Sequence, residues 1–300
     1  MDDYKKHTTK DGSFSLYSLS YEEGFHDKNG ALRESIDKYL LPAQLERFSN
    51  AEKIVVLDVC MGLGYNTGCI LEKLLQSNIK IQWHGLEIDQ RPLNLGVNEK
   101  IFQEIWSPKV LHFFNCLNKS GKWTEGFNEG TIHWGDARQK IYEIQGSLQF
   151  DLILLDPFSP QKCPELWSEE FISLLTERLS FDGRLITYST AASIRASLKR
   201  AGLNIYSIVP SSDDQRKWSS GTVAMKNKIE QQLIEKNCQI KELSTKEVEH
   251  LATRSSIPYR DPTGQGNSKE IISTREIEQS KSQLINTSSW RKRWNTARKQ

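Results

Sequence analysis

The sequence lacks the features that mark a secreted, membrane-spanning or disulfide-linked protein. It has 5 cysteines in 300 residues, and none of them forms a Cys-x-x-Cys pair. An odd number of such cysteines argues against a zinc knuckle or a disulfide scaffold and favours a reducing compartment. No run approaches the roughly 18 apolar residues of a membrane helix, and the first residues contain no apolar stretch. We therefore expect neither a membrane span nor a signal peptide, and a cytoplasmic location.

The sequence also lacks a strong charge of either sign and is short of apolar residues. Lys and Arg number 40 against 38 Asp and Glu, which leaves a net charge of +2. The overall charge therefore indicates no partner, and local charge has to be considered instead. Apolar residues make up only 37% of the chain. The core must accordingly be concentrated in one part of the sequence.

Apolar runs alternate between strand-like and helix-like patterns from Ile54 to Met225. Strands that are apolar throughout, separated by helices, are typical of a mostly parallel sheet covered on both faces. We therefore predict a doubly wound α/β fold with a seven-stranded sheet, whose last two strands form an antiparallel pair. This domain spans 51–225, between an N-terminal extension (1–50) and a polar, partly helical C-terminal extension with a basic tail (226–300). Strands are expected at 54–58, 79–87, 131–134, 150–155, 184–188, 203–209 and 221–225, and helices at 69–75, 92–102, 168–179 and 191–201.

A glycine-rich turn follows the first expected strand. Gly62 and Gly64 allow the backbone to turn sharply and to approach a ligand closely. Thr67 stands where the dinucleotide pattern G-x-G-x-x-G requires its third glycine. The turn is therefore typical of a nucleotide-binding α/β protein but disfavours NAD and FAD.

Acidic residues end four of the expected strands: Asp58, Glu87, Asp136 and Asp156. Ligands of open α/β sheets bind at this carboxyl edge. Glu87 suits the two hydroxyls of a ribose, and Asp136 suits an adenine amino group. Four acids favour a ligand with positive charge and oppose a polyphosphate, which points to S-adenosylmethionine with its sulfonium, ammonium and ribose diol. The alternative is that each acid only caps a following helix.

The segment after the fourth strand carries the expected chemistry. It reads Asp-Pro-Phe-Ser-Pro from Asp156, and Pro-Glu-Leu-Trp follows at 164–167. We expect Phe158 and Trp167 to form the walls of a pocket for a planar base, with Asp156 holding an amine. A primary alkyl amine has a pKa of about 10.4, so a carboxylate that removes its proton is useful before the nitrogen attacks. The alternative is that Asp156 caps a turn while both aromatic residues are core.

At these motifs the sequence resembles the MnmC-like methyltransferases of tRNA wobble-uridine modification. The matching stretches are 11–18 (DGSFSLYS), 30–35 (GALRES), the Gly62 loop, 156–167 and 190–195 (TAASIR). Pro157 and Cys163 depart from the residues usual in that family. The resemblance to its stand-alone MnmD type implies a Rossmann-like class I fold and methylation of 5-aminomethyl-2-thiouridine.

The resemblance also implies roles for individual residues. Asp156 is the expected catalytic acid/base, and no metal is expected. The expected S-adenosylmethionine ligands are Asp58, Gly62, Gly64, Asn66, Glu87, Asp136 and Ala137. The expected substrate-binding residues are Phe158, Ser159 and Trp167.

The expected partner is the anticodon stem-loop of a tRNA, with the base flipped towards Asp156. A separate enzyme would make the aminomethyl group, because the sequence shows no oxidase domain. The segment from Trp290 to Lys299 is basic with interleaved aromatic residues. It suits phosphates and unpaired bases, although a solvated chain end is an equal alternative. Three other functions stay open: an aminopropyltransferase related to polyamine synthases, a methyltransferase of another small amine on the same fold, and an inactive nucleic-acid-binding module.

Overall fold

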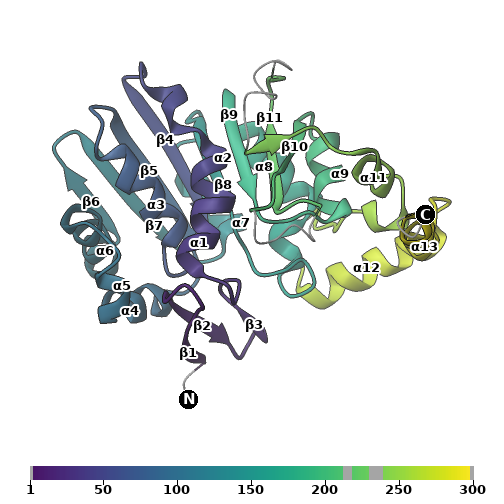
Figure 1. The fold of residues 1–300 in the computed structure, drawn as a ribbon, viewed down its shortest axis with the longest axis horizontal. Helices are drawn as coiled ribbons and strands as arrows, with labels where there is room; N and C mark the ends of the chain where they lie inside the picture. The colour runs from purple at the N-terminus through teal and green to yellow at the C-terminus, as the bar shows by residue number, and fades with distance from the viewer. Residues whose placement is uncertain (1–2, 212–217, 230–238, 298–300) are drawn as a thin grey trace. The chain divides into compact units, whose positions relative to one another are not determined.

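The computed structural model describes residues 3–211, 218–229 and 239–297, which fold into two compact units (Figure 1). The first unit comprises Met1–Phe158 and Arg178–Thr187, and the second comprises Ser159–Glu177 and Tyr188–Gln300. The predicted N-terminal extension lies wholly in the first unit, and the predicted C-terminal extension lies wholly in the second. Of the basic tail, Arg298 and Lys299 lie outside the described residues.

The first unit is built on a mostly parallel sheet, as the sequence predicted. Its strands lie in the order β9-β8-β4-β5-β7-β6. All neighbouring pairs are parallel except β6 and β7. The strands are β4 (Lys53–Val59), β5 (Lys80–Glu87), β6 (Lys122–Glu125), β7 (Asn128–Trp134), β8 (Phe150–Leu155) and β9 (Leu179–Thr187).

The central strands are buried along nearly their whole length, as parallel strands covered on both faces must be. In β4 only Lys53 is exposed, and Leu152 to Leu155 of β8 are all buried. Backbone hydrogen bonds continue past the strand ends: the Asp156 N–H donates to the Val59 carbonyl at 3.1 Å, and the Gly135 N–H donates to the Glu87 carbonyl at 2.8 Å. The loops after β4, β5, β7 and β8 therefore leave from one edge of the sheet.

Helices of the first unit connect these strands. They are α3 (Tyr65–Leu74), α4 (Arg91–Val97), α5 (Lys100–Gln103), α6 (Pro108–Ser120), α7 (Ala137–Lys140) and η3 (Ile141–Glu143). The prediction of one helix over 92–102 was wrong, because Glu99 is extended and a new helix begins after it. The prediction also missed α6, and its seven strands were two too few for the described residues, because it missed β6 and, in the second unit, β12 (Ile240–Lys241). The side chain of Ser107 caps α6, with Pro108 in the first turn, a recognised helix-start signal.

The fifth strand of the prediction was too short. We expected Asp182 and Gly183 to form a turn before a strand at 184–188, but both lie within β9. The pairing with β8 shifts register between Phe150 and Leu152, opposite this part of β9. An irregularity of this kind accommodates the polar residues without ending the strand.

The N-terminal segment adds a small sheet and a helical run to the first unit. Strands β1 (Tyr4–Thr8), β2 (Phe14–Ser18) and β3 (Glu23–Gly24) form an antiparallel sheet. The helical run comprises α1 (Ala31–Ser35), η1 (Ile36–Leu40), α2 (Leu41–Ala43) and η2 (Leu45–Phe48). The η1 turn contacts both α3 and β9. This contact brings residues near position 40 to the glycine loop that begins α3.

The second unit contains the expected antiparallel pair, β10 (Asn204–Ile208) and β11 (Gly221–Met225), with β12 (Ile240–Lys241) beside β10. Its helices are η4 (Pro164–Trp167), α8 (Glu169–Arg178, whose last residue belongs to the first unit), α9 (Ala192–Arg200), α11 (Thr245–His250), η6 (Arg254–Ser256), α12 (Ser268–Lys281) and α13 (Thr287–Ala297). In the described part of the chain, no helix has the length and apolar character needed to cross a membrane.

Candidate active site

The glycine loop joins β4 to α3 through backbone conformations that favour glycine. Cys60, Gly62 and Gly64 have φ angles of 67°, 57° and 92°. A Cβ atom on Gly64 would lie 2.6 Å from the ring of Phe114, and one on Gly62 would lie 3.1 Å from the ring of Phe25. Both the backbone and the lack of space therefore require glycine at position 64.

Asp58 lies beneath this loop with its carboxylate fully buried. The Thr67 hydroxyl donates to Asp58 Oδ2 at 2.5 Å, and Trp83 Nε1 donates to the Thr67 oxygen at 2.9 Å. Asp58 Oδ1 has no hydrogen-bond partner within the described residues. Burial, with a further contribution from the charge of Glu87, raises the pKa of Asp58 to about 7. Because protein atoms cover this oxygen, Asp58 can act on a cationic ligand through its charge and not by direct contact.

Glu87 ends β5 and holds the glycine loop closed. Its carboxylate accepts from the Gly62 N–H at 2.8 Å and from the N–H groups of Ile88 and Asp89 at 2.7 and 3.0 Å. Burial raises the pKa of Glu87 despite these three donors. Because a carboxylate offers about four lone-pair sites, roughly one remains for a further donor such as a ribose hydroxyl.

Asp136 follows β7 and caps α7, as the capping alternative expects. Its Oδ1 accepts from the Arg138 N–H at 2.9 Å, and its Oδ2 pairs with the Arg138 guanidinium at 2.7 Å. The side chain of Asp136 is 35% exposed. Ala137 begins α7 and is buried. A ligand amino group at Asp136 would therefore meet a carboxylate that already has a cationic neighbour.

Asp156 follows β8 and is held by two side chains from distant parts of the sequence. The Tyr39 hydroxyl donates to Asp156 Oδ1 at 2.5 Å, and the Asn66 amide donates to Oδ2 at 2.7 Å. Burial, followed by the charge of Glu34, raises the pKa of Asp156 to about 8, while the two hydrogen bonds oppose this shift. A raised pKa at a strand end is typical of a functional carboxylate. Asn66 thus links the glycine loop to the expected catalytic residue.

Aromatic residues of the first unit surround Phe158. Its ring stacks on Tyr21 with centroids 4.4 Å apart and meets the edge of Phe25 at 5.1 Å. All three rings are partly exposed. Because Phe25 also lies against Gly62, this cluster extends from the glycine loop to the loop after β8. Partly exposed rings in such a position are suited to packing against a planar base.

The other two expected substrate residues belong to the second unit. Trp167 is fully buried and meets Tyr188 edge-on at 5.8 Å, which agrees with the alternative that it is a core residue. The Ser159 carbonyl accepts from the N–H groups of Lys162 and Cys163 at 2.8 and 2.9 Å. Ser159 therefore shapes the turn that leads into η4.

The sequence reasoning missed Tyr39, Tyr21 and Phe25. Tyr39 is separated from Asp156 by 117 positions, so no local motif could link the two. Tyr21 and Phe25 lie just beyond the matched stretch 11–18, in a segment without a regular apolar period. Thr67 was noted only because it is not glycine, whereas the structure shows that its hydroxyl orients Asp58.

Together these residues fit S-adenosylmethionine. Gly62 and Gly64 put no side chain between the loop backbone and a ligand, and the charge of the buried Asp58 suits a positively charged group. Across the described ranges, no group of three or more His, Cys, Asp or Glu residues is arranged to hold a metal ion. The fold and the site define an S-adenosylmethionine-dependent methyltransferase.

Comparison with known proteins agrees with this class. The model of a family described as S-adenosyl-L-methionine-dependent methyltransferase matches residues 102–224. An uncharacterized protein of Methanocaldococcus jannaschii is 30% identical over 272 residues, which are 89% of this chain and 70% of that protein. The crystal structure of MnmC2 from Aquifex aeolicus is 27% identical, with a TM-score of 0.78 over 93% of this chain and 86% of that one.

The bifunctional MnmC protein of Azoarcus sp. (strain BH72), named for tRNA 5-methylaminomethyl-2-thiouridine biosynthesis, is 28% identical over 201 residues. The match covers 63% of this chain but only 31% of that protein. The chain thus spans about a third of this bifunctional relative. On these similarities, the chain belongs to the MnmC-like family of S-adenosylmethionine-dependent methyltransferases.

Proposed function

We propose that the protein transfers a methyl group from S-adenosylmethionine to the 5-aminomethyl group of the wobble uridine in a cytoplasmic tRNA. The observation that carries this proposal is the Asp156 carboxyl group, held by Tyr39 and Asn66 beside the glycine loop. The names of the bifunctional relative and of the Aquifex aeolicus protein support the choice of substrate.

S-adenosylmethionine supplies a methyl group on a positively charged sulfur, which the amine nitrogen takes as the carbon–sulfur bond breaks. Asp156 accepts the proton that the nitrogen must lose. An ordinary aspartate, with a pKa of about 4, is a poor base towards an amine whose pKa is about 10.4. The raised pKa of Asp156, about 8, reduces this mismatch and so favours the proton transfer.

The remaining residues of the proposed site bind and orient. The charge of the buried Asp58 attracts the positive charge of the methionine part, and the remaining lone-pair site of Glu87 accepts from the ribose. Asp136 and Ala137 contact the adenine. Gly62 and Gly64 allow the close approach of the backbone. The ring of Phe158, with Tyr21 and Phe25, packs against the flipped uridine, and Ser159 and Trp167 shape the segment that follows.

The test is methyl transfer to undermodified tRNA, followed by mass spectrometry of the nucleosides. We expect a methyl group on the aminomethyl uridine and no product with putrescine and decarboxylated S-adenosylmethionine, the substrates of an aminopropyltransferase. Asp156→Asn should lower kcat by at least about 100-fold, the usual contribution of a general base, and should keep cofactor affinity within a few fold by calorimetry.

Asp182→Asn is the matched control, because it removes the same charge from an exposed position on β9. It should retain wild-type activity. A folded wild-type protein that binds the cofactor but methylates no nucleoside would exclude the proposed substrate. A fully active Asp156→Asn variant would remove the proposed acid/base.

A further inference from the structure

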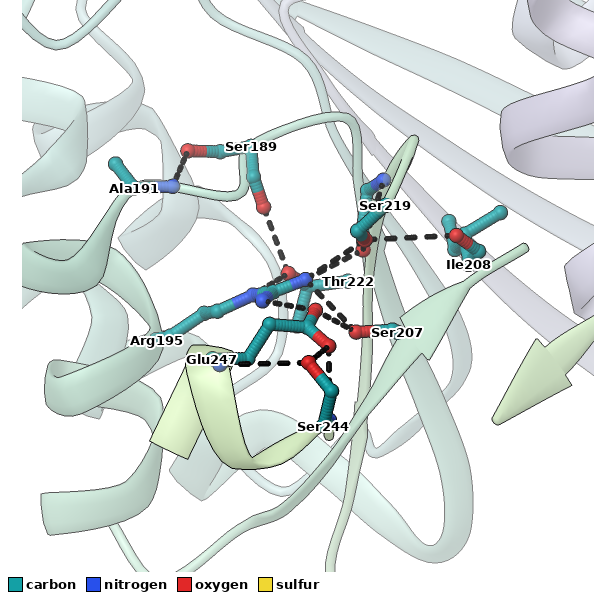
Figure 2. Close-up of polar contacts among 10 residues, drawn as sticks. Ser189, Ala191, Arg195, Ser207, Ile208, Ser219, Thr222, Ser244 and Glu247 are labelled. Atoms are coloured by element: carbon teal, nitrogen blue, oxygen red, sulfur yellow. Dashed lines mark hydrogen bonds and ion pairs between the residues drawn. The ribbon is translucent and has the colours of Figure 1, made fainter. Parts of the chain in front are cut away.

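A buried ion pair fixes α11 to the core of the second unit. Arg195 and Glu247 are 1% and 0% exposed, and Arg195 Nη1 lies 2.8 Å from Glu247 Oε1. Figure 2 shows the guanidinium of Arg195 directed at Glu247 and at the side chains around it. The guanidinium also donates to Thr222 Oγ1 at 2.8 Å and to Ser219 Oγ at 2.9 Å. The neighbours of Glu247 on α11 are therefore held in fixed positions.

Helix α13 packs on α11 through aromatic contacts. Trp290 is buried and stacks on His250, with centroids 4.4 Å apart and planes 12° from parallel. Lys246 Nζ lies 5.7 Å from the centre of the Trp290 ring. Glu249 accepts from Trp294 Nε1 at 2.7 Å and pairs with Arg293. Residues 287–297 thus form a docked helix, and the covered ring of Trp290 is not free to stack on a base.

This docking leaves a cationic surface where α13 meets α11. The helix reads TSSWRKRWNTA and contains three cations and no acid. Arg291, Lys292 and Arg293 are all exposed, and Lys246 lies beside them on Trp290. Burial, followed by the nearby charges of Arg195, Arg291 and Lys246, lowers the pKa of His250 to about 4. His250 is therefore neutral near pH 7, and Glu249 offsets the charge of Arg293. Three cations define the α13 basic surface: Lys246, Arg291 and Lys292.

We propose that the α13 basic surface binds backbone phosphates of the tRNA, an inference that rests on the function proposed above. Arg and Lys on a rigid helix are suited to phosphate, because they offer charge and donors without base-specific geometry. The aromatic residues of this segment hold the helix in place instead of reading bases. Phosphate contacts of this kind strengthen tRNA binding without entering the chemical step, so they act on KM and not on kcat.

The test compares the wild type with an Arg291→Gln/Lys292→Gln double variant. Lys109→Gln/Lys119→Gln is the matched control, because it removes two exposed cations from α6. We expect the Arg291/Lys292 variant to raise the KM for tRNA about tenfold, with kcat within twofold. The slope of log affinity against log salt should become shallower by roughly one to two, in line with the loss of one or two phosphate contacts. The α6 control should match the wild type in the KM for tRNA and in the salt dependence of binding.

Filter binding of tRNA, which needs no methyl transfer, separates this inference from the proposed function. Weaker binding by the Arg291/Lys292 variant but not by the α6 control supports the basic surface, even if no nucleoside is methylated. Equal tRNA affinity and equal salt dependence in all three proteins would overturn it. Unchanged thermal unfolding of the variants excludes misfolding as the cause of a loss.

Discussion

The Tyr39 hydroxyl donates a hydrogen bond of 2.5 Å to Asp156 across 117 positions of sequence. Asn66 occupies the other carboxylate oxygen at 2.7 Å. The N-terminal segment and the helix after the glycine loop therefore each hold one oxygen of the proposed base. These two donors favour the charged carboxylate, whereas burial and the charge of Glu34 favour the neutral acid. The balance places the pKa of Asp156 at about 8.

Replacing Tyr39 by Phe should move the activity profile to higher pH. The variant loses a donor to the carboxylate, so the pKa of Asp156 rises further above 8 and the basic form is reached at higher pH. We expect the rising limb of log kcat/KM to move up by about one unit, which corresponds to a roughly tenfold loss at pH 7 and a partial recovery at pH 9.

Tyr142→Phe is the control, because Tyr142 is 69% exposed. This variant should leave the pH profile of kcat/KM unchanged. If Tyr39 had only a packing role, Tyr39→Phe would lower the rate equally at all pH values. A rising limb that stays at the wild-type pH would contradict our interpretation of this hydrogen bond.

Gly64→Ala should destabilise the protein and weaken cofactor binding. Gly64 has a φ angle of 92°, and a Cβ atom would lie 2.6 Å from the ring of Phe114. Gly126→Ala separates the two causes, since Gly126 has a φ angle of 62° but no atom within 4 Å of the added Cβ. We expect a loss of about 1 kcal/mol for Gly126→Ala from backbone strain alone, and of about 3 kcal/mol for Gly64→Ala. Urea unfolding measures both, and equal losses would show that the contact with Phe114 relaxes freely.

Asp58→Asn should stabilise the ligand-free protein at alkaline pH while weakening S-adenosylmethionine binding. The folded-state pKa of Asp58 is raised from 3.8 to about 7. The free energy of unfolding therefore falls as the pH rises from about 4 to about 7, because only the unfolded chain ionises in that window. At pH 8 the variant should be more stable by about 4 kcal/mol, and at pH 4 the difference should be small.

Thermal unfolding at the two pH values tests this stability difference, and calorimetry tests the ligand. We expect at least a tenfold loss of cofactor affinity, because Asn offers no charge to a cation. Wild-type affinity in the variant would show that the charge of Asp58 does not contribute to cofactor binding.

The parts of the site that the sequence predicted are those set by local pattern. The apolar runs located β4, β5, β7 and β8, and parallel pairing then brought the acids that follow them to one edge. The sequence could not choose between a ligand and a cap for Asp136, because both roles need an available carboxylate. Arg138, two residues further on, occupies that carboxylate in the structure.

Other parts depend on contacts that no local pattern carries. Tyr39 lies on a π-helical turn whose partners come from α3 and the loop after β8, so only the folded chain shows its role. Asp182 and Gly183 indicated a turn, but the sheet accommodates them through a register shift. The signal for α6 was present, since Ser107 and Pro108 form a standard helix start, and the prediction did not use it.

The buried pair of Arg195 and Glu247 should be costly to break from one side and less costly to replace as a whole. Glu247→Leu leaves the Arg195 guanidinium charged in the core, compensated by its hydroxyl and carbonyl acceptors (Figure 2) and by the ring of Trp218, 6.0 Å away. We expect a loss of about 3–5 kcal/mol for Glu247→Leu, and a smaller loss for the Arg195→Met/Glu247→Leu double variant. The exposed pair of Lys100 and Glu104 is the control, and Glu104→Ala should cost less than about 1 kcal/mol. Urea unfolding of the single and double variants measures this coupling. If the losses of Arg195→Met and Glu247→Leu simply add in the double variant, the two residues are not energetically coupled. Other contacts must then hold α11 in place.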